Sequence, residues 1–99
     1  MMNKVIFLDS SKAEFEDAVR FYNSQSEGLG FEFALEVRNT LERIDMHPDA
    51  WHQLSINTRR CRTKRFPYGI VYQKRDEYIL IVAIMHLHQK PRVFNASSN

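Results

Sequence analysis

The sequence predicts an α+β domain in which a helical hairpin packs on one face of an antiparallel sheet, in the order β-α-α-β-β-β. Three observations predict this class. Two segments of helical periodicity follow each other after a short break, one β-rich segment precedes them, and three more follow. The 99 residues are about the size of one domain. We therefore expect a single domain over residues 1–99, with a disordered tail after about residue 94.

The first strand is expected at residues 3–9, NKVIFLD, because this run is short, β-branched and aromatic. The helix after it is expected to begin with a capping box formed by Ser11 and Glu14, with Ser10 as an alternative cap. Over about four turns an apolar stripe then recurs at helical spacing, formed by Phe15, Ala18, Val19 and Tyr22.

The polar, glycine-containing stretch NSQSEGLG breaks this pattern. A second helix is expected from about Gly30 to Met46, and Pro48 ends it. Its apolar residues form a heptad-like seam that Phe33 widens: Ala34, Val37, Leu41 and Ile44. Two amphipathic helices joined by a short loop predict an antiparallel hairpin.

Residues 48–58, PDAWHQLSINT, are expected to connect the hairpin to the sheet, held to the body by Trp51 and Leu54. Three strands should follow, at about 59–66, 68–75 and 77–86. The polar stretch KRDEY is typical of a tight hairpin between the last two. The final strand, YILIVAIMH, is apolar at nearly every position, which predicts a central strand buried on both faces.

Composition narrows the class of protein. No apolar run approaches the roughly 20 residues that cross a bilayer, and the N-terminus carries no signal peptide, so we expect a cytoplasmic protein without membrane partners. The lone Cys61 makes no internal disulfide and is expected to be an inert thiol in a strand.

The charge is unevenly distributed along the chain. Residues 1–49 hold five Lys or Arg against ten Asp or Glu, a net charge of −5, whereas residues 50–99 hold nine against two, a net +7. The C-terminal half is therefore expected to attract a polyanion or an acidic protein partner.

The chain lacks the common catalytic motifs: a glycine-rich phosphate loop, a G-x-S-x-G elbow, an H-E-x-x-H pair and paired cysteines. His86 and His88 share one face of the last strand, but two ligands without a third make a poor metal site. We expect neither a metal nor another cofactor.

The stretch RRCRTKR holds five cations in seven residues. In an extended strand these residues alternate between two faces, one set being Arg60, Arg62 and Lys64, the other Arg59, Cys61, Thr63 and Arg65. Phe66 and Pro67 suggest a bulge or kink, which leaves open which set faces solvent. The basic strand is either a solvated edge that discourages aggregation or a functional surface.

Histidine, tyrosine and basic groups gathered on one sheet would suit RNA cleavage without a metal. Such a site needs a group that takes the 2′-OH proton, an acid for the leaving oxygen, and cations for the charge on the phosphorane. Histidine titrates near neutral pH, and arginine offers a fork that matches phosphate.

The order of elements and two motifs together resemble the RelE/ParE superfamily of bacterial toxins, over roughly residues 4–94. The motifs are R-F-P-Y-x-I-x-Y at Arg65–Tyr72 and H-x-x-x-x-P at His86–Pro91. The resemblance implies a growth-inhibiting toxin of a type II toxin–antitoxin, or plasmid-stabilisation, module. A cognate antitoxin with an acidic, amphipathic C-terminal segment would neutralise it, which suits the net +7 half.

The resemblance implies one of two targets. ParE-like members inhibit DNA gyrase, and the long helical hairpin favours this reading. RelE-like members cleave mRNA on the ribosome, and His86 with the basic strand would suit that alternative. The sequence departs from relatives at Gln89, where many carry arginine, and Phe94 is the only aromatic residue after Pro91. The missing cation at position 89 removes one stabiliser of phosphate charge, which weighs against ribonuclease activity and against toxicity.

Three hypotheses follow. The first is a ParE-like toxin that acts on gyrase. The second is a ribosome-dependent mRNA endonuclease with His86 as acid or base, Tyr72 shaping or stacking in the site, and three phosphate-stabilising cations: Arg62, Lys64 and Arg65. The third is a non-toxic binding module. In every case the antitoxin or another polyanion would bind a shared set of residues: Arg59, Arg60, Arg62, Lys64, Arg65, His88 and Lys90.

Overall fold

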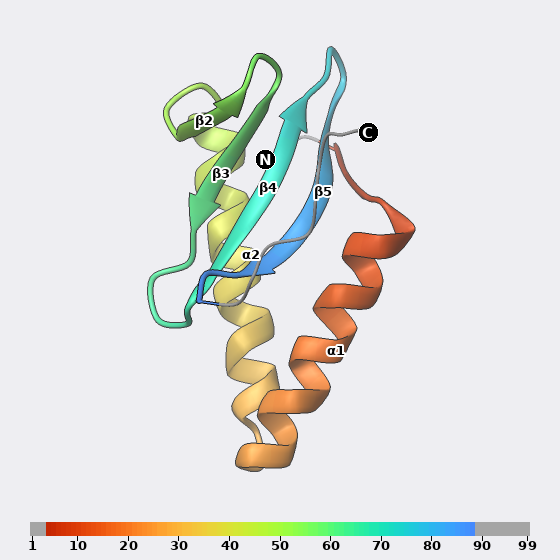
Figure 1. Cartoon of the computed structure of the whole chain (residues 1–99), viewed down its shortest axis with the longest axis vertical. Helices are drawn as coiled ribbons and strands as arrows, with labels where there is room; N and C mark the ends of the chain where they lie inside the picture. Colours follow the sequence, from red (N-terminus) through yellow and green to blue (C-terminus); the bar gives the residue numbers. More distant parts are fainter. Residues whose placement is uncertain (1–3, 89–99) are drawn as a thin grey trace.

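The protein is an α+β fold in which two helices cover one face of a five-stranded sheet, as the sequence predicts (Figure 1). The structure is a computed structural model, of which residues 4–88 are described. The elements in chain order are β1 (Lys4–Phe7), α1 (Asp9–Gln25), α2 (Leu29–Met46), β2 (His52–Ser55), β3 (Thr58–Arg62), β4 (Tyr68–Lys74) and β5 (Tyr78–His86). α1 packs mainly on β5 and α2 on β3 and β4, and the loop between the helices extends past the end of the sheet (Figure 1).

The strands lie in the order β1-β5-β4-β3-β2. The sheet is mostly antiparallel, but β1 runs parallel to β5, with Lys4 opposite Tyr78 and Phe7 opposite Ile81. After the two helices the chain re-enters the sheet at β2, which runs opposite to β1, and the three antiparallel pairings that follow bring β5 into the same direction as β1. β5 lies between β1 and β4, which confirms the prediction of an internal strand.

The prediction of a plain connector at residues 48–58 is wrong in part, because it contains β2. This strand pairs antiparallel with β3, His52 opposite Arg60, and its register shifts at Leu54. All four of its residues are exposed, so no alternation of apolar and polar residues marks it. Trp51 packs on the core as predicted. Leu54 is 40% exposed and does not anchor the segment.

The predicted capping box at the start of α1 is wrong. The helix begins at Asp9, with Leu8 as N-cap and no side-chain cap. Ser11 is fully buried and its hydroxyl lies within hydrogen-bond distance of the Ile81 carbonyl, at 2.9 Å, and the Glu14 carboxylate accepts from the Ile84 backbone N–H at 2.9 Å. The pairing of β1 with β5 ends at Ile81. The side chains of Ser11 and Glu14 therefore bond backbone groups of β5 at the last paired residue and beyond it.

Two glycines shape the hairpin between the helices. Gly28 has a φ of 86°, a conformation that glycine adopts without steric cost. Gly30 lies against α1: a Cβ there would be 2.4 Å from the Val19 carbonyl oxygen, and its N–H donates to the Asn23 side chain at 2.8 Å. The helices therefore approach closely at this end of the hairpin.

The core lies between the helices and the sheet. The predicted seam of α2 is confirmed for Val37, Leu41 and Ile44, which are buried together with Phe33, whereas Ala34 is only partly buried. Phe33 packs against Phe66 and Tyr68, with ring centroids 5.2 and 4.9 Å away. These rings fix the entry to β4 against the helical layer. Across residues 4–88, neither helix has the length and apolar character needed to cross a membrane.

Candidate functional site

The basic strand β3 divides its side chains between the two faces of the sheet. Cys61 is 1% exposed and belongs to the core beneath the helices. Because neighbouring residues of a strand point to opposite faces, Arg60 and Arg62 lie on the face turned away from the helices, which we call the open face. The sequence left open which of the two alternating sets of residues faces away from the helices, and the burial of Cys61 shows that it is the set that contains Arg60 and Arg62.

Arg60 lies flat across the open face above Gly69. A Cβ on Gly69 would be 2.9 Å from Arg60 Cδ, so a side chain at this position would force the arginine to shift. The Nε of Arg60 is buried and has no hydrogen-bond partner within residues 4–88. Arg62, opposite Gly69 in the ladder, is exposed. The open face thus carries two guanidinium groups, and one of them is partly desolvated.

Arg59 belongs to the other face. Its guanidinium donates to the Trp51 carbonyl oxygen at 2.9 Å, and it stands opposite Tyr72 in the ladder. These contacts tie the segment before β2 to the sheet. The structure therefore gives Arg59 a bonding partner within the fold and separates it from Arg60 and Arg62.

Lys64 and Arg65 lie beyond the strand, in the turn of residues 63–67 that joins β3 to β4. The Lys64 backbone N–H donates to Glu36 of α2 at 2.6 Å, and Arg65 forms an ion pair of 2.8 Å with Glu32 of α2. The Arg65 guanidinium also lies 5.1 Å from the centroid of the Phe66 ring. Two carboxylates of the same helix thus hold this basic turn.

Arg43 of α2 is a third helix residue that holds the end of β3 and the basic turn against the helix. It donates to the Arg62 carbonyl oxygen at 3.2 Å and to the Thr40 hydroxyl at 3.0 Å, and it lies 3.9 Å from the Glu36 carboxylate. None of the three helix residues that hold the turn was predicted from the sequence as a site residue: Glu32, Glu36 and Arg43. Their spacing of four and seven residues on one side of a helix is the signal that could have pointed to them.

Tyr72 lies in the core and has no exposed surface. Its hydroxyl donates to the Pro48 carbonyl oxygen, and burial raises the pKa of the phenol well above its ordinary value of 10.0. In this conformation the ring offers nothing to stack on, and the hydroxyl is already engaged. Tyr72 joins the connector after α2 to the sheet.

His86 lies on the helix side of the sheet, at the end of β5. It pairs with Tyr68, with ring centroids 5.0 Å apart, and its Nδ1 accepts a hydrogen bond of 3.1 Å from the His88 backbone N–H. Leu87 N–H donates to the Pro67 carbonyl oxygen, which places the end of β5 beside the β3–β4 turn. His86 and Arg62 thus lie at one end of the sheet but on opposite faces.

Some of the predicted residues lie outside residues 4–88, namely Gln89, Lys90 and Phe94. Within the described part of the chain, no three His, Cys, Asp or Glu side chains come together in a way that could hold a metal ion. Cys61 is buried, and its burial raises the pKa of the thiol.

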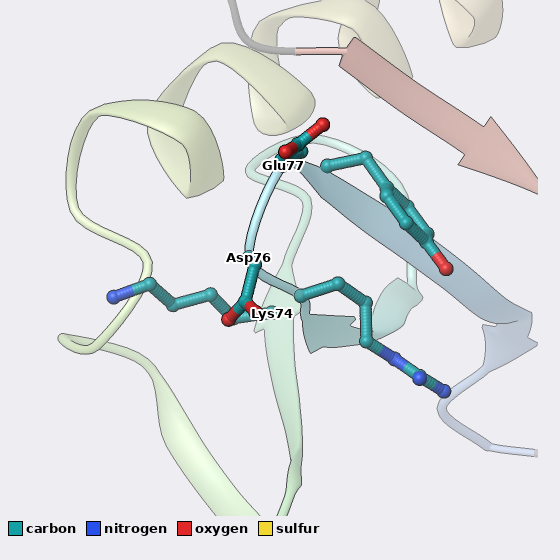
Figure 2. Close-up of a pocket in the computed structure, with 5 residues that line it drawn as sticks. Lys74, Asp76 and Glu77 are labelled. Atoms are coloured by element: carbon teal, nitrogen blue, oxygen red, sulfur yellow. The ribbon is translucent and has the colours of Figure 1, made fainter.

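A surface hollow of about 500 Å³ lies at the β4–β5 turn, at the opposite end of β4 from the basic turn. It is lined by Lys74, Arg75, Asp76, Glu77 and Tyr78. Figure 2 shows that the side chains of Lys74 and Glu77 point away from each other. Lys74 instead lies 3.3 Å from Asp49. The hollow brings no reactive groups together.

The family model described as "ParE toxin of type II toxin-antitoxin system, parDE" matches residues 5–91. A search of curated proteins finds no significant match.

Two solved structures share the fold. One is titled "Chromosomal ParDE TA system from P. aeruginosa": its TM-score is 0.75 at 10% identity, over 88% of this chain and 98% of that chain. The other is titled "The structure of YoeB dimer from Staphylococcus aureus": its TM-score is 0.61 at 14% identity, over 86% of this chain and 97% of that chain. At such identities the likeness concerns the fold alone.

Proposed function

Since this chain belongs to the family of ParE toxins of type II toxin–antitoxin systems, we propose that it inhibits growth by acting on DNA gyrase and that a cognate antitoxin neutralises it. The observation that carries the choice of target is the separation of the groups that an endonuclease would need. Arg62 lies on the open face, His86 lies on the helix side, and Tyr72 is in the core. Protein binding requires no such convergence.

The open face is the surface that best fits an acidic antitoxin. Arg60 and Arg62 lie side by side there, and the buried Nε of Arg60 lacks a partner within residues 4–88. A carboxylate that reached Arg60 would make a charge-assisted hydrogen bond, which is about twice as strong as a neutral one. It would also satisfy a donor that is otherwise buried at a cost.

The target is tested with purified protein and purified gyrase. Supercoiling should fall, and gyrase-mediated DNA cleavage should rise, in proportion to added protein, and equimolar antitoxin should suppress both effects. Supercoiling and cleavage that stay unchanged in a preparation that arrests growth on induction would exclude gyrase as the target. Induction without any growth defect would favour the non-toxic binding module.

Antitoxin docking is tested by charge reversal. Arg60→Glu and Arg62→Glu should each weaken binding of the antitoxin's acidic segment by about tenfold or more, since each turns an attraction into a like-charge contact. Arg75→Glu is the matched control, because Arg75 is exposed at the β4–β5 turn, far from the open-face arginines along β4, and its guanidinium bonds the side-chain amide of Gln73. Equal losses in all three variants would show that only net charge matters.

One observation keeps the mRNA endonuclease as the second candidate. The hydrogen bond from His88 N–H to His86 Nδ1 leaves the Nε2 of His86 for a substrate, beside the aromatic ring of Tyr68. In that reading His86 acts as acid or base. Primer extension on translated mRNA after induction distinguishes the two targets: codon-phased cuts that His86→Ala abolishes would favour the endonuclease.

A further inference from the structure

The turn between β2 and β3 carries an apolar residue at its apex. Ile56 and Asn57 form a two-residue turn between the last residue of β2 and the first residue of β3, which pair with each other. Ile56 is 93% exposed. Turns of this length favour asparagine, aspartate and glycine, because these residues adopt the required backbone conformations. The needs of the turn therefore do not explain a β-branched apolar residue at this position.

Leu54 adds a second apolar side chain beside the turn. The register of the β2–β3 pair shifts between Gln53 and Ser55, so Leu54 stands opposite no residue of β3, and it is 40% exposed. Irregularities of this kind re-aim a side chain. Because Leu54 does not anchor the segment to the core, it is available, together with Ile56, to another molecule. We call residues 54–57 the β-hairpin tip.

Side-chain hydrogen bonds hold the β-hairpin tip in one conformation. The Gln53 amide donates to the Ile56 carbonyl oxygen at 3.4 Å. The Asn57 side-chain oxygen accepts from the hydroxyls of Ser55 and Thr58 at 3.4 and 3.1 Å. A segment that is ordered before binding loses little conformational entropy when it binds. The β-hairpin tip thus presents its apolar side chains in a fixed position.

The surroundings of the β-hairpin tip carry no net charge. Residues 53–58, QLSINT, contain no Asp, Glu, Lys or Arg. The β4–β5 turn lies at the same end of the sheet (Figure 1), and its residues 74–77, KRDE, hold two cations and two carboxylates. An acidic antitoxin segment finds no excess of positive charge here, whereas it finds one on the open face at Arg60 and Arg62.

We propose that the β-hairpin tip binds gyrase by inserting Ile56 into an apolar pocket of that protein. The inference rests on the proposed function, which gives the chain two protein partners. The antitoxin matches the open face by charge, and the neutral, apolar β-hairpin tip fits the other partner. Burial of an aliphatic side chain that is almost fully exposed in the free protein stabilises the complex through the apolar area removed from water.

The shape of the β-hairpin tip argues against a second copy of this chain as the partner. A protruding turn is not complementary to the same turn of another copy, as a two-fold interface requires. The surface hollow at the β4–β5 turn is lined mainly by charged residues, so it offers no apolar pocket to the turn of another copy. The β-hairpin tip precedes β3 and the basic turn follows it, so the two partners bind at different places on the sheet.

Supercoiling assays with purified gyrase and the full chain test the inference. Ile56→Ser should raise the concentration that gives half-inhibition by about tenfold or more. Phe31→Ser is the matched control, because Phe31 is 66% exposed but lies near the start of α2, at the other end of the molecule (Figure 1). Equal inhibition by Ile56→Ser and the parent, or equal losses in both variants, overturns the inference alone. A parent without effect on gyrase refutes the proposed function, and the inference with it.

Graded substitutions test insertion into an apolar pocket. Ile56→Val, Ile56→Ala and Ile56→Asp should weaken inhibition in that order, by about threefold, about tenfold and about a hundredfold, as apolar area is lost and a charge is then buried. Urea midpoints should stay at the parent's value, since the side chain is exposed in the free protein. Three variants with the same inhibition would overturn insertion.

Antitoxin affinity tests the choice of partner. By isothermal titration calorimetry, Ile56→Ser should bind the cognate antitoxin within about twofold of the parent, whereas a loss of about tenfold would assign the β-hairpin tip to the antitoxin and overturn the inference. In a Cys61→Ser background, a benzophenone attached to Ile56→Cys should cross-link to a gyrase subunit on illumination, and one attached to Phe31→Cys should not. Cross-links from both positions, or from neither, would contradict the assigned contact.

Discussion

The Glu36 carboxylate on α2 accepts a hydrogen bond of 2.6 Å from the backbone N–H of Lys64, the second residue of the basic turn. Glu36 is 12% exposed at its side chain and lies 3.9 Å from Arg43, which in turn bonds the Arg62 carbonyl oxygen. The helix thus fixes the backbone of the basic turn from both sides of Thr63. The position of the turn's cations depends on this contact.

Replacing Glu36 should therefore destabilise the fold. In Glu36→Ala the Lys64 N–H and the half-buried Arg43 lose their partner, and we expect a loss of about 1–3 kcal/mol in the free energy of unfolding. Urea denaturation followed by circular dichroism measures it. Glu42→Ala is the control, since its ion pair with Arg38 is exposed and should be worth no more than about 0.5 kcal/mol. Equal losses would contradict the assigned role of Glu36.

Gly30→Ala should open the helical hairpin. The added Cβ would be 2.4 Å from the Val19 carbonyl oxygen, a backbone atom that cannot rotate away. Overpacking of this kind costs about 1–3 kcal/mol, measurable as a lower urea midpoint. Gly28→Ala serves as comparison, because nothing lies within 4 Å there and only its positive φ opposes a side chain. Gly28→Asn should be milder than Gly28→Ala, since asparagine tolerates this conformation better.

The sequence predicted those elements whose side chains repeat with the period of a helix or strand. Phe33, Val37 and Ile44 revealed α2 because the core selects every third or fourth residue. β2 escaped because none of its four residues is buried. Its pairing with β3 depends on backbone hydrogen bonds, which leave no mark on residue type.

The candidate site was predicted less well, because it depends on which face each residue takes. Ser11 and Glu14 have the spacing of a capping box, but three residues apart on a helix also means one shared face, and here that face meets β5. Arg59 and Arg60 are adjacent cations, yet only the burial of Cys61 decides which of them reaches the open face. Such choices depend on tertiary packing.

Stability should decline in alkaline solution. Burial raises the pKa of Tyr72, Tyr22 and Tyr68 above 10.0, and that of the Cys61 thiol above 9.0. Because the unfolded chain loses these protons first, it binds fewer protons than the folded chain, and stability falls as pH rises. The contribution is complete below about pH 9 and is lost progressively above it.

Tyr72→Phe separates the two roles of this residue. At pH 7 the variant should lose about 0.5–1.5 kcal/mol, because the Pro48 carbonyl oxygen loses its donor. Between pH 9 and 11 its stability should fall less steeply than that of the parent, as one buried phenol no longer titrates. Urea midpoints measured across this range provide the check. Parallel curves for both proteins would show that Tyr72 does not contribute to the alkaline loss.

Gly69→Ala should weaken antitoxin binding without changing any charge. The added methyl group would displace Arg60, whose Cδ would lie 2.9 Å from it, and the guanidinium would leave its flat position on the open face. We expect about tenfold weaker binding of the acidic segment, or about 1.4 kcal/mol, by isothermal titration calorimetry. In an Arg60→Met background the same substitution should change the affinity less than twofold, because no guanidinium remains to be displaced. A tenfold loss that persists in that background would mean that Gly69 acts through the shape of the sheet and that Arg60 is not the group that receives the antitoxin.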